Sequence, residues 1–212
     1  FGTKVREYFG IEISRNLIEA SKNRYWEDGK NLLFLHCDAR TMPLPTNYFD
    51  LVLFSFNGID HVNINGRLQM LKEINRVLKR GQYFCFSSHN MRYIGKKIYH
   101  KSRCGYGSFK SLAYNFTNSP IKTITRVMEW QILIRKFQEA KIKQNYVLIR
   151  DRLIDGIDAD MFYIDPIAQI KQLQREGFNN VRVFSLDSGE ELSHKALINS
   201  ADCWLYYLCC KT

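Results

Sequence analysis

The sequence lacks the features that define several classes of protein. None of its apolar runs approaches the roughly 20 residues that a membrane-spanning helix needs, so we expect no membrane partner. Its six cysteines show neither C-x-x-C spacing nor paired histidines, so the pattern does not indicate a zinc site. Several cysteines lie in apolar runs typical of strands, where a free thiol packs as a small hydrophobe. These features predict reduced thiols and a cytoplasmic protein without a bound metal.

Acidic residues are missing from a long central stretch. No aspartate or glutamate lies between Glu73 and Glu129, although the net charge of the chain is +10. The basic residues of this stretch are Arg76, Lys79, Arg80, Arg92, Lys96, Lys97, Lys101, Arg103, Lys110, Lys122 and Arg126. A basic surface attracts anionic partners over a long range. A nucleic acid, an anionic small molecule and a merely solvated basic face are all compatible with this pattern.

What the chain does contain is the pattern of an α/β domain. Its 212 residues are 45% hydrophobic and 14% aromatic, which suits one sizeable core and argues against bulk disorder. Alternating strands and helices predict a doubly wound, mostly parallel sheet, and the short connection before the final strand predicts an antiparallel return. Residues 50–56 are apolar throughout, as in a strand covered on both faces. The predicted strands are 8–13, 32–36, 50–56, 82–88, 181–184 and 203–210, and the predicted helices are 15–28, 64–79, 121–140 and 166–176.

Acidic and polar residues follow three of the predicted strands. Glu12 ends the first strand, Asp38 follows the second, and residues 55–58 form a polar loop after the third. Ligands of an open α/β sheet bind outside the carboxyl ends of its strands. A carboxylate at such a position suits a ribose diol, because it accepts two hydroxyl hydrogen bonds. The pattern therefore predicts a site for a nucleoside-like cofactor.

The pattern changes after residue 90. Aromatic residues, among them Tyr93, Tyr99 and Tyr106, alternate with basic residues through a segment that also holds several glycines. We interpret residues 91–140 as an insertion that forms a lid over a substrate pocket. Aromatic and basic residues in this arrangement can also bind a nucleic acid, or can simply pack together.

In these segments the sequence resembles the class I S-adenosylmethionine-dependent methyltransferases, which have a Rossmann-like fold. The resemblance extends over about residues 5–89 and again over 162–211. Each matching segment is weak alone, but their order and spacing together are specific. The segments are residues 10–14, similar to the second strand; 37–44, similar to the loop that binds adenine; 49–58, similar to the fourth strand and its loop; and 73–81, similar to the helix before the fifth strand.

The resemblance implies that the cofactor is S-adenosyl-L-methionine and that the reaction is methyl transfer to an acceptor oxygen, nitrogen or carbon. The acceptor is expected to be a small molecule, anionic or aromatic, in contact with Tyr93, Tyr99 and Tyr106. His61 is a candidate general base, although loop histidines near a site often have no role. The residues that the resemblance places at the cofactor are Glu12 and Ile13 at the ribose, Asp38 and Ala39 at the adenine, and Ser55, Phe56, Asn57 and Gly58 at the methionine side.

One part of the family pattern has no counterpart in the sequence. The glycine-rich loop that follows the family's first strand, and lets backbone approach the cofactor, is absent. The family's first strand lies between its second and fourth, so we expect the strands at 8–13 and 50–56 to lack a partner. Each orphaned buried backbone group would cost about 1–3 kcal/mol. We therefore expect residues 1–212 to form a single methyltransferase domain that is incomplete at its N-terminus and binds cofactor weakly.

Three other functions stay open. A nucleic-acid methyltransferase, acting for example on RNA, would show salt-dependent binding of RNA or DNA through residues 91–126. A non-catalytic module of the same fold would bind cofactor without methyl transfer. A dehydrogenase also carries an acid at its second strand, but residues 38–39 and 73–81 fit that family poorly.

Overall fold

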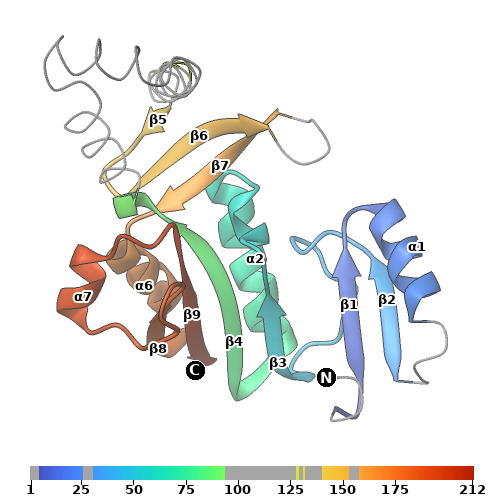
Figure 1. The fold of residues 1–212 in the computed structure, drawn as a ribbon. Helices are drawn as coiled ribbons and strands as arrows, with labels where there is room; N and C mark the ends of the chain where they lie inside the picture. Colours follow the sequence, from blue (N-terminus) through green and yellow to red (C-terminus); the bar gives the residue numbers. More distant parts are fainter. Residues whose placement is uncertain (1–4, 26–30, 94–127, 129–130, 132–139, 153–157) are drawn as a thin grey trace, which may run out of the picture.

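The computed structural model describes residues 5–25, 31–93, 128, 131, 140–152 and 158–212, which form a mixed α/β fold (Figure 1). Within these residues, none of the helices combines the length and the apolar composition needed to cross a membrane. In chain order the elements are β1 (Tyr8–Glu12), α1 (Arg15–Arg24), β2 (Leu32–His36), β3 (Phe49–Phe54), the 3-10 helix η1 (Gly58–Asp60), α2 (Ile64–Val77), β4 (Leu78–Asn90), β5 (Lys141–Ile142), β6 (Tyr146–Arg152), β7 (Asp158–Ile164), α6 (Pro166–Arg175), β8 (Phe178–Ser185), α7 (His194–Asn199) and β9 (Trp204–Lys211).

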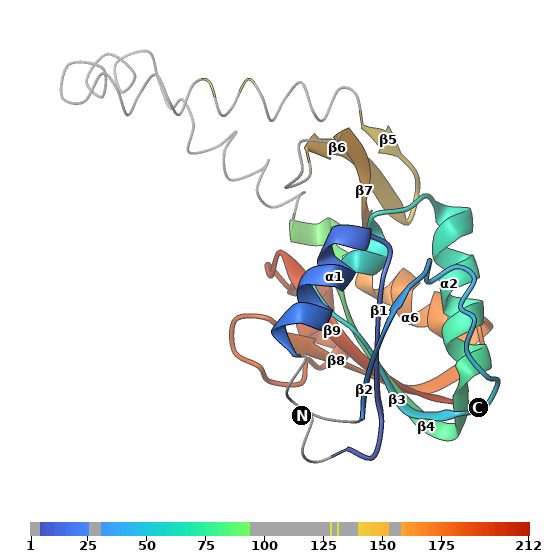
Figure 2. The same cartoon turned by 90° about the vertical axis from the view of Figure 1, so that its right-hand side faces the viewer.

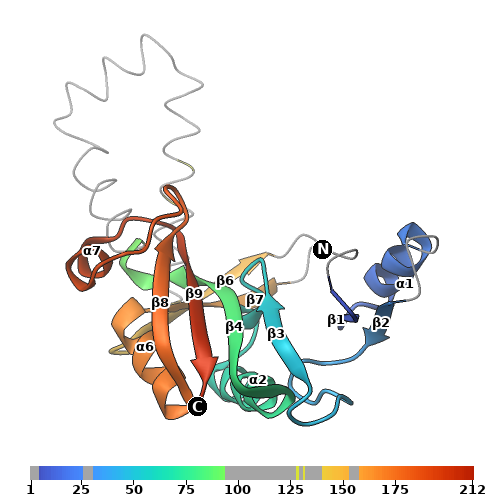
Figure 3. The same cartoon turned by 90° about the horizontal axis from the view of Figure 1, so that it is seen from below.

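The strands form two separate hydrogen-bonded sheets. β1 and β2 pair in parallel, while seven strands form a second sheet in the order β5-β6-β7-β4-β9-β8, with β3 paired to β4. The β3–β4 pair is parallel, and β9 runs antiparallel to both β4 and β8. Figures 2 and 3 show α1 on one side of the strands and α2 and α6 on the other. The predicted fold class, with its antiparallel last strand, is confirmed.

The hairpins of β5, β6 and β7 were not predicted from the sequence. They form an antiparallel extension that joins the main sheet where β7 pairs with residues 89 and 90 of β4. The sheet is therefore more mixed in direction than expected. Most of the predicted helix at 121–140, together with Tyr99, Tyr106 and Cys104, lies outside the described residues.

The two sheets meet beside β1 and β3 without a shared ladder. Among the described residues, β1 pairs only with β2 and β3 only with β4. Side chains connect the amino ends of these strands, where the Phe9 and Phe49 rings lie 5.2 Å apart and the Tyr48 hydroxyl donates to Glu7 at 2.5 Å. Within the described part of the chain, the second edge of β1 and the second edge of β3 thus lack a strand partner, as Figure 1 shows.

The prediction that the third strand is covered on both faces was wrong. Side chains alternate between the two faces of a strand. Val52 and Phe54 pack against the main core, but Leu51 and Leu53 on the opposite face are 53% and 59% exposed. No helix of the described part of the chain covers that face of β3, because α1 packs on β1 and β2 instead.

The main core lies between the seven-stranded sheet and the helices α2 and α6. Its central residues include Leu71 and Ile74 of α2, Phe84 and Phe86 of β4, and Leu173 of α6, all buried. The side chain of Asn63 caps α2 by accepting a hydrogen bond from the Gly66 amide. The helix predicted at 64–79 ends slightly earlier, at Val77, and Gly81, with φ of +73°, lies within β4.

The start of α6 follows the prediction. The Asp165 carboxylate accepts hydrogen bonds from the amides of Ile167 and Ala168, and Pro166 occupies the first turn, where an amide donor would have no helical partner. The helix ends at Arg175, before Gly177.

The described cysteines behave as packing residues. Cys37, Cys85, Cys203, Cys209 and Cys210 are free thiols. Burial raises the pKa of the Cys209 thiol well above its ordinary value, so this thiol stays protonated and unreactive. In the part of the chain that the structure describes, no group of histidine, cysteine and acidic side chains has the arrangement of a metal site.

Arg76 fixes the loop that follows β2 and is a testable part of the fold. Its guanidinium donates to the carbonyl oxygens of Met42 at 2.8 Å and Leu44 at 2.7 Å, and it pairs with Glu73, which also accepts from the Met42 amide. Arg76→Ala should lower the free energy of unfolding by about 2 kcal/mol, because charge-assisted hydrogen bonds are lost. Chemical denaturation would measure this loss. Arg80→Ala, at an exposed position of β4, should change stability by less than about 0.5 kcal/mol.

The same ion pair predicts how stability depends on pH. Arg76 holds the pKa of Glu73 below its ordinary value, mainly through a side-chain hydrogen bond. A lowered folded-state pKa stabilises the protein above the ordinary value of about 4.3, and this stabilisation is lost as the pH falls toward the folded-state pKa. Wild-type protein should therefore lose more stability than Arg76→Ala between neutral pH and pH 4. Equal losses in the two proteins would contradict this assignment.

Candidate functional site

Two acidic residues lie at the carboxyl ends of neighbouring parallel strands. Glu12 is the last residue of β1, and Asp38 follows the end of β2 at His36. The register pairs Glu12 with His36, and the Cys37 amide donates to the Glu12 carbonyl oxygen at 3.1 Å. Both acids are therefore carried by one edge of the β1–β2 sheet, where an open α/β sheet binds its ligands.

Glu12 has hydrogen-bonding capacity left over. Its Oε1 accepts from the Ser14 amide at 2.9 Å, which holds the turn between β1 and α1, and within the described residues Oε2 has no hydrogen-bond partner. Ser14 precedes the helix as predicted, but its side chain makes no capping hydrogen bond. The neighbouring Ile13 is exposed, and its carbonyl oxygen accepts from His36 at 2.9 Å. A carboxylate with one oxygen unused can accept hydrogen bonds from a ligand hydroxyl.

Asp38 is paired with a residue that the sequence did not single out. Arg40 donates to Asp38 through its backbone amide at 2.8 Å and through its guanidinium at 2.6 Å and 2.9 Å. Side-chain hydrogen bonding with Arg40 lowers the pKa of Asp38, so the carboxylate is ionised at neutral pH. Both oxygens are engaged by Arg40, so an amino group of a ligand would compete with this guanidinium for Asp38. Ala39, between them, packs against the main core.

The loop after β3 has an unusual backbone. Phe56 and Asn57 both have positive φ, +53° and +55°, a conformation that costs non-glycine residues energy and is frequent at functional sites. The Phe56 side chain is 89% exposed, while Asn57 is buried. A Cβ on Gly58 would lie 2.5 Å from the Phe54 ring, so this position requires glycine unless the ring moves. Ser55, at the start of the loop, is exposed.

Asn57 connects this loop to the end of β4. Its backbone amide donates to the Ser87 hydroxyl at 2.9 Å, and its side-chain Nδ2 lies 3.3 Å from Nε2 of His89. Its Oδ1 is buried, and among the described residues it has no hydrogen-bond partner. An unsatisfied buried acceptor costs about 1–3 kcal/mol, so a ligand donor or a water at this position would stabilise the loop.

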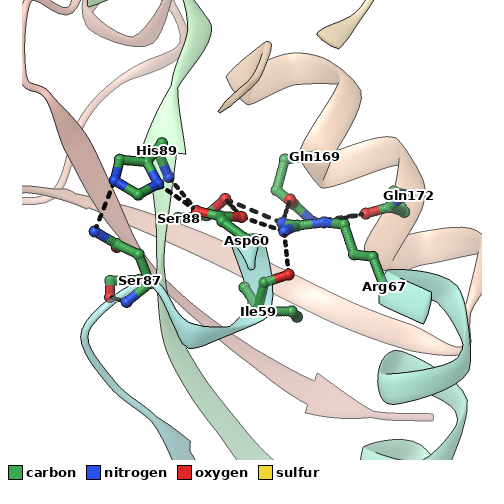
Figure 4. Close-up of polar contacts among 9 residues, drawn as sticks. Ile59, Asp60, Arg67, Ser87, Ser88, His89, Gln169 and Gln172 are labelled. Carbon is green, nitrogen blue, oxygen red and sulfur yellow. Dashed lines mark hydrogen bonds and ion pairs between the residues drawn. The ribbon is translucent and has the colours of Figure 1, made fainter. Parts of the chain in front are cut away.

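A buried ionic network lies beside the same loop, and the sequence analysis missed it. Figure 4 shows Asp60 of η1 between His89 on one side and Arg67 of α2 on the other. Asp60 and Arg67 are fully buried. The sequence contained one sign of this network: Arg67 lies on the same face of its helix as the apolar residues 71 and 74, one turn before residue 71.

Every polar group of the Arg67–Asp60 pair is satisfied. A guanidinium has five N–H donors, and those of Arg67 are accepted by Asp60, the Ile59 carbonyl, Ser88, Gln169 and Gln172. Asp60 Oδ1 also accepts from the Ser88 hydroxyl at 2.9 Å, and Oδ2 accepts from the backbone amide of His89 at 2.7 Å and from its ring Nδ1 at 2.9 Å. Burial of these charges is therefore compensated by a complete set of hydrogen bonds.

The remaining sequence candidates have other surroundings. His61 is an exposed residue at the end of η1, and partial desolvation lowers its pKa. The histidine whose ring hydrogen-bonds to Asp60 is His89. Tyr93 packs against the small cluster of Val147 and Ile149. Tyr99 and Tyr106 are not among the described residues.

Comparison with known proteins finds similar methyltransferase sequences. Residues 1–86 match the family model described as a methyltransferase domain. A demethylmenaquinone methyltransferase from Staphylococcus saprophyticus is 40% identical over 75 residues, covering 35% of this chain and 30% of that protein. Its counterpart from Staphylococcus haemolyticus is 25% identical over 191 residues, covering 89% of this chain and 64% of that protein. The chain thus spans less than two thirds of the length of these curated relatives.

The fold is also found among solved structures. A S-adenosylmethionine-dependent methyltransferase from Clostridium acetobutylicum aligns with a TM-score of 0.57 and 12% identity, covering 99% of this chain and 76% of that one. The residues at the strand ends fit such a cofactor in two respects. Glu12 has an unused carboxylate oxygen for hydroxyl donors, and Asn57 has a buried acceptor that needs a donor. At Asp38 a ligand amino group would compete with Arg40.

Proposed function

We infer that this chain belongs to the class I S-adenosylmethionine-dependent methyltransferases and is part of an enzyme that transfers a methyl group from S-adenosyl-L-methionine to a small-molecule acceptor. The observation that carries this proposal is the placement of Glu12 and Asp38 at adjacent ends of parallel strands. The match of residues 1–86 to a methyltransferase domain supports it independently.

The roles of the site residues follow from their chemistry. Glu12, beside Ile13, accepts hydrogen bonds from the ribose hydroxyls, and Asp38, beside Ala39, accepts from the adenine amino group once Arg40 has turned away. The loop at 55–58 contacts the methionine side, where Asn57 offers its unpaired oxygen. The cofactor, when bound, supplies an electrophilic methyl group, and the protein aligns it with the acceptor and excludes water.

The acceptor is a small aromatic or anionic molecule in this proposal. The name of the Staphylococcus relatives supports a small-molecule acceptor. The basic, tyrosine-rich composition of residues 91–140 supports an anionic or aromatic acceptor, and the free thiols agree with a cytoplasmic location. A nucleic-acid acceptor is the alternative that the test below separates.

Binding and transfer measured on the whole protein test this function. Calorimetry with S-adenosylhomocysteine should show saturable binding. Methyl transfer from the radiolabelled cofactor should appear with small phenols or reduced quinones and not with RNA. Transfer to RNA that falls steeply with added salt would replace the small-molecule assignment by a nucleic-acid one. Binding without transfer to any component of a cell extract would indicate a non-catalytic module, and no binding would overturn the proposal.

A further inference from the structure

The contact between Asp60 and His89 fixes the state of the histidine ring. Both oxygens of Asp60 accept hydrogen bonds, and Arg67 balances its charge, so Asp60 is a carboxylate with no proton to donate. Nδ1 of His89, 2.9 Å from Oδ2, must therefore carry the ring proton. In the neutral ring, Nε2 is then the basic nitrogen.

Nε2 faces a group that can accommodate either protonation state. The Nδ2 of Asn57 lies 3.3 Å from it, at the long end of hydrogen-bond distances, while Oδ1 of the same amide is buried and unpaired. If Nε2 gains a proton, rotation of the Asn57 amide by half a turn lets Oδ1 accept a hydrogen bond from the new N–H group. A histidine with only a structural role needs one such state, whereas a proton acceptor needs both.

The position of His89 suits contact with a substrate. It lies at the carboxyl end of β4, next to the loop that holds Phe56 and Asn57, and its side chain is 12% exposed. The centroid of its ring lies 4.7 Å from that of Tyr163 and 6.3 Å from that of Trp204, and these contacts restrict the orientation of the ring. An orienting carboxylate on one nitrogen and a second nitrogen that carries no proton is the arrangement of an activated base.

We propose that His89 is the general base of this methyltransferase, that its acceptor is a hydroxyl compound, and that Asp60 and Arg67 are positioning residues. The inference rests on the proposed function. The acceptor hydroxyl takes the place of the Asn57 amide at Nε2. Its oxygen forms a bond to the methyl carbon with its own electron pair, the bond from that carbon to sulfur breaks with its pair left on a neutral thioether, and the hydroxyl proton moves to Nε2. The resulting imidazolium is paired with Asp60.

Several groups around His89 affect a pH experiment. Asp60 contacts the ring directly, and Arg67 acts on it through Asp60. Tyr163 faces it from β7 and the uncharged Trp204 from β9. His61 is close enough for the charge of His89 to lower its pKa. His61→Gln is therefore the matched control, because it removes the other titrating histidine near Asp60.

The experiment compares His89→Asn, His89→Gln and His61→Gln in the whole protein. Asparagine keeps an N–H donor near Asp60, whereas glutamine places an amide near Nε2, so at least one variant should fold. Nitrogen-15 spectra of the wild type should show the proton on Nδ1 at pH 8. Both His89 variants should bind S-adenosylhomocysteine within about threefold of the wild type, lose about 100-fold or more in kcat and lose the acidic limb of the pH profile. His61→Gln should keep all three properties.

Three results would overturn the proposal. The first is a His89 variant that binds S-adenosylhomocysteine and retains kcat within threefold of the wild type. The second is an acidic limb that disappears in His61→Gln instead. The third is a wild-type protein that fails to bind S-adenosylhomocysteine, which removes the proposed function together with this inference, whereas the first two leave that function intact.

Discussion

Replacement of Arg67 by alanine is expected to lower the free energy of unfolding by about 3–5 kcal/mol, because it leaves a buried carboxylate without its partner. Arg67 and Asp60 have no exposed side-chain surface. The substitution also removes the donors that face Ser88, Gln169, Gln172 and the Ile59 carbonyl, so five acceptors, Asp60 included, lose a hydrogen bond at once. Chemical denaturation followed by circular dichroism would measure the change.

Two controls separate the buried charge from a general loss of packing. The double variant Asp60→Asn with Arg67→Met removes both charges, so it leaves no unpaired ion. Its loss of stability should therefore be smaller than the sum of the losses of the two single variants. Arg175→Ala, at an exposed position of α6, should change stability by less than about 0.5 kcal/mol. A loss below 1 kcal/mol for Arg67→Ala would show that the network is not buried as described.

Glu12→Ala in the whole protein is expected to weaken binding of S-adenosylhomocysteine by about 100-fold, which corresponds to about 2.8 kcal/mol. The expected loss comes from two hydroxyl hydrogen bonds to a charged acceptor. The affinity of Glu12→Gln should lie between those of the wild type and Glu12→Ala, since the glutamine carbonyl oxygen can still accept from the Ser14 amide and preserve the turn. Titration calorimetry gives the affinities directly.

Glu7 provides the matched control for Glu12. It is an acidic residue just before β1, at the opposite end of the strand, where it accepts from the Tyr48 hydroxyl at 2.5 Å. Glu7→Gln should leave the affinity for S-adenosylhomocysteine within about threefold of the wild type. An equal loss in the Glu7 and Glu12 variants would indicate a general effect on β1 and not a contact with the ribose.

The strand ends could be predicted because their signals are local. A short apolar run followed by an acid fixes both the strand and the position of its carboxylate, so β1, β2 and the placement of Glu12 follow from neighbouring residues. The cap of α6 is equally local, since Asp165 and Pro166 act on the first turn of their own helix.

The features that were missed depend on distant residues. Arg67 contacts Gln169, 102 residues further along the chain, and no local pattern distinguishes it from a solvated arginine. The exposure of Leu51 and Leu53 depends on whether a helix covers that face of β3, which an apolar run alone does not indicate. The ion pair of Asp38 with Arg40 is local, but many sequences contain such a spacing without a salt bridge.

A crystal structure of the whole protein with S-adenosylhomocysteine would examine the nucleoside site without relying on any variant. We predict that both ribose hydroxyls lie about 3 Å from the carboxylate of Glu12, with the adenine amino group near Asp38 and Arg40 turned away. Density for the nucleoside away from both carboxylates, with Arg40 still paired to Asp38, would contradict the account.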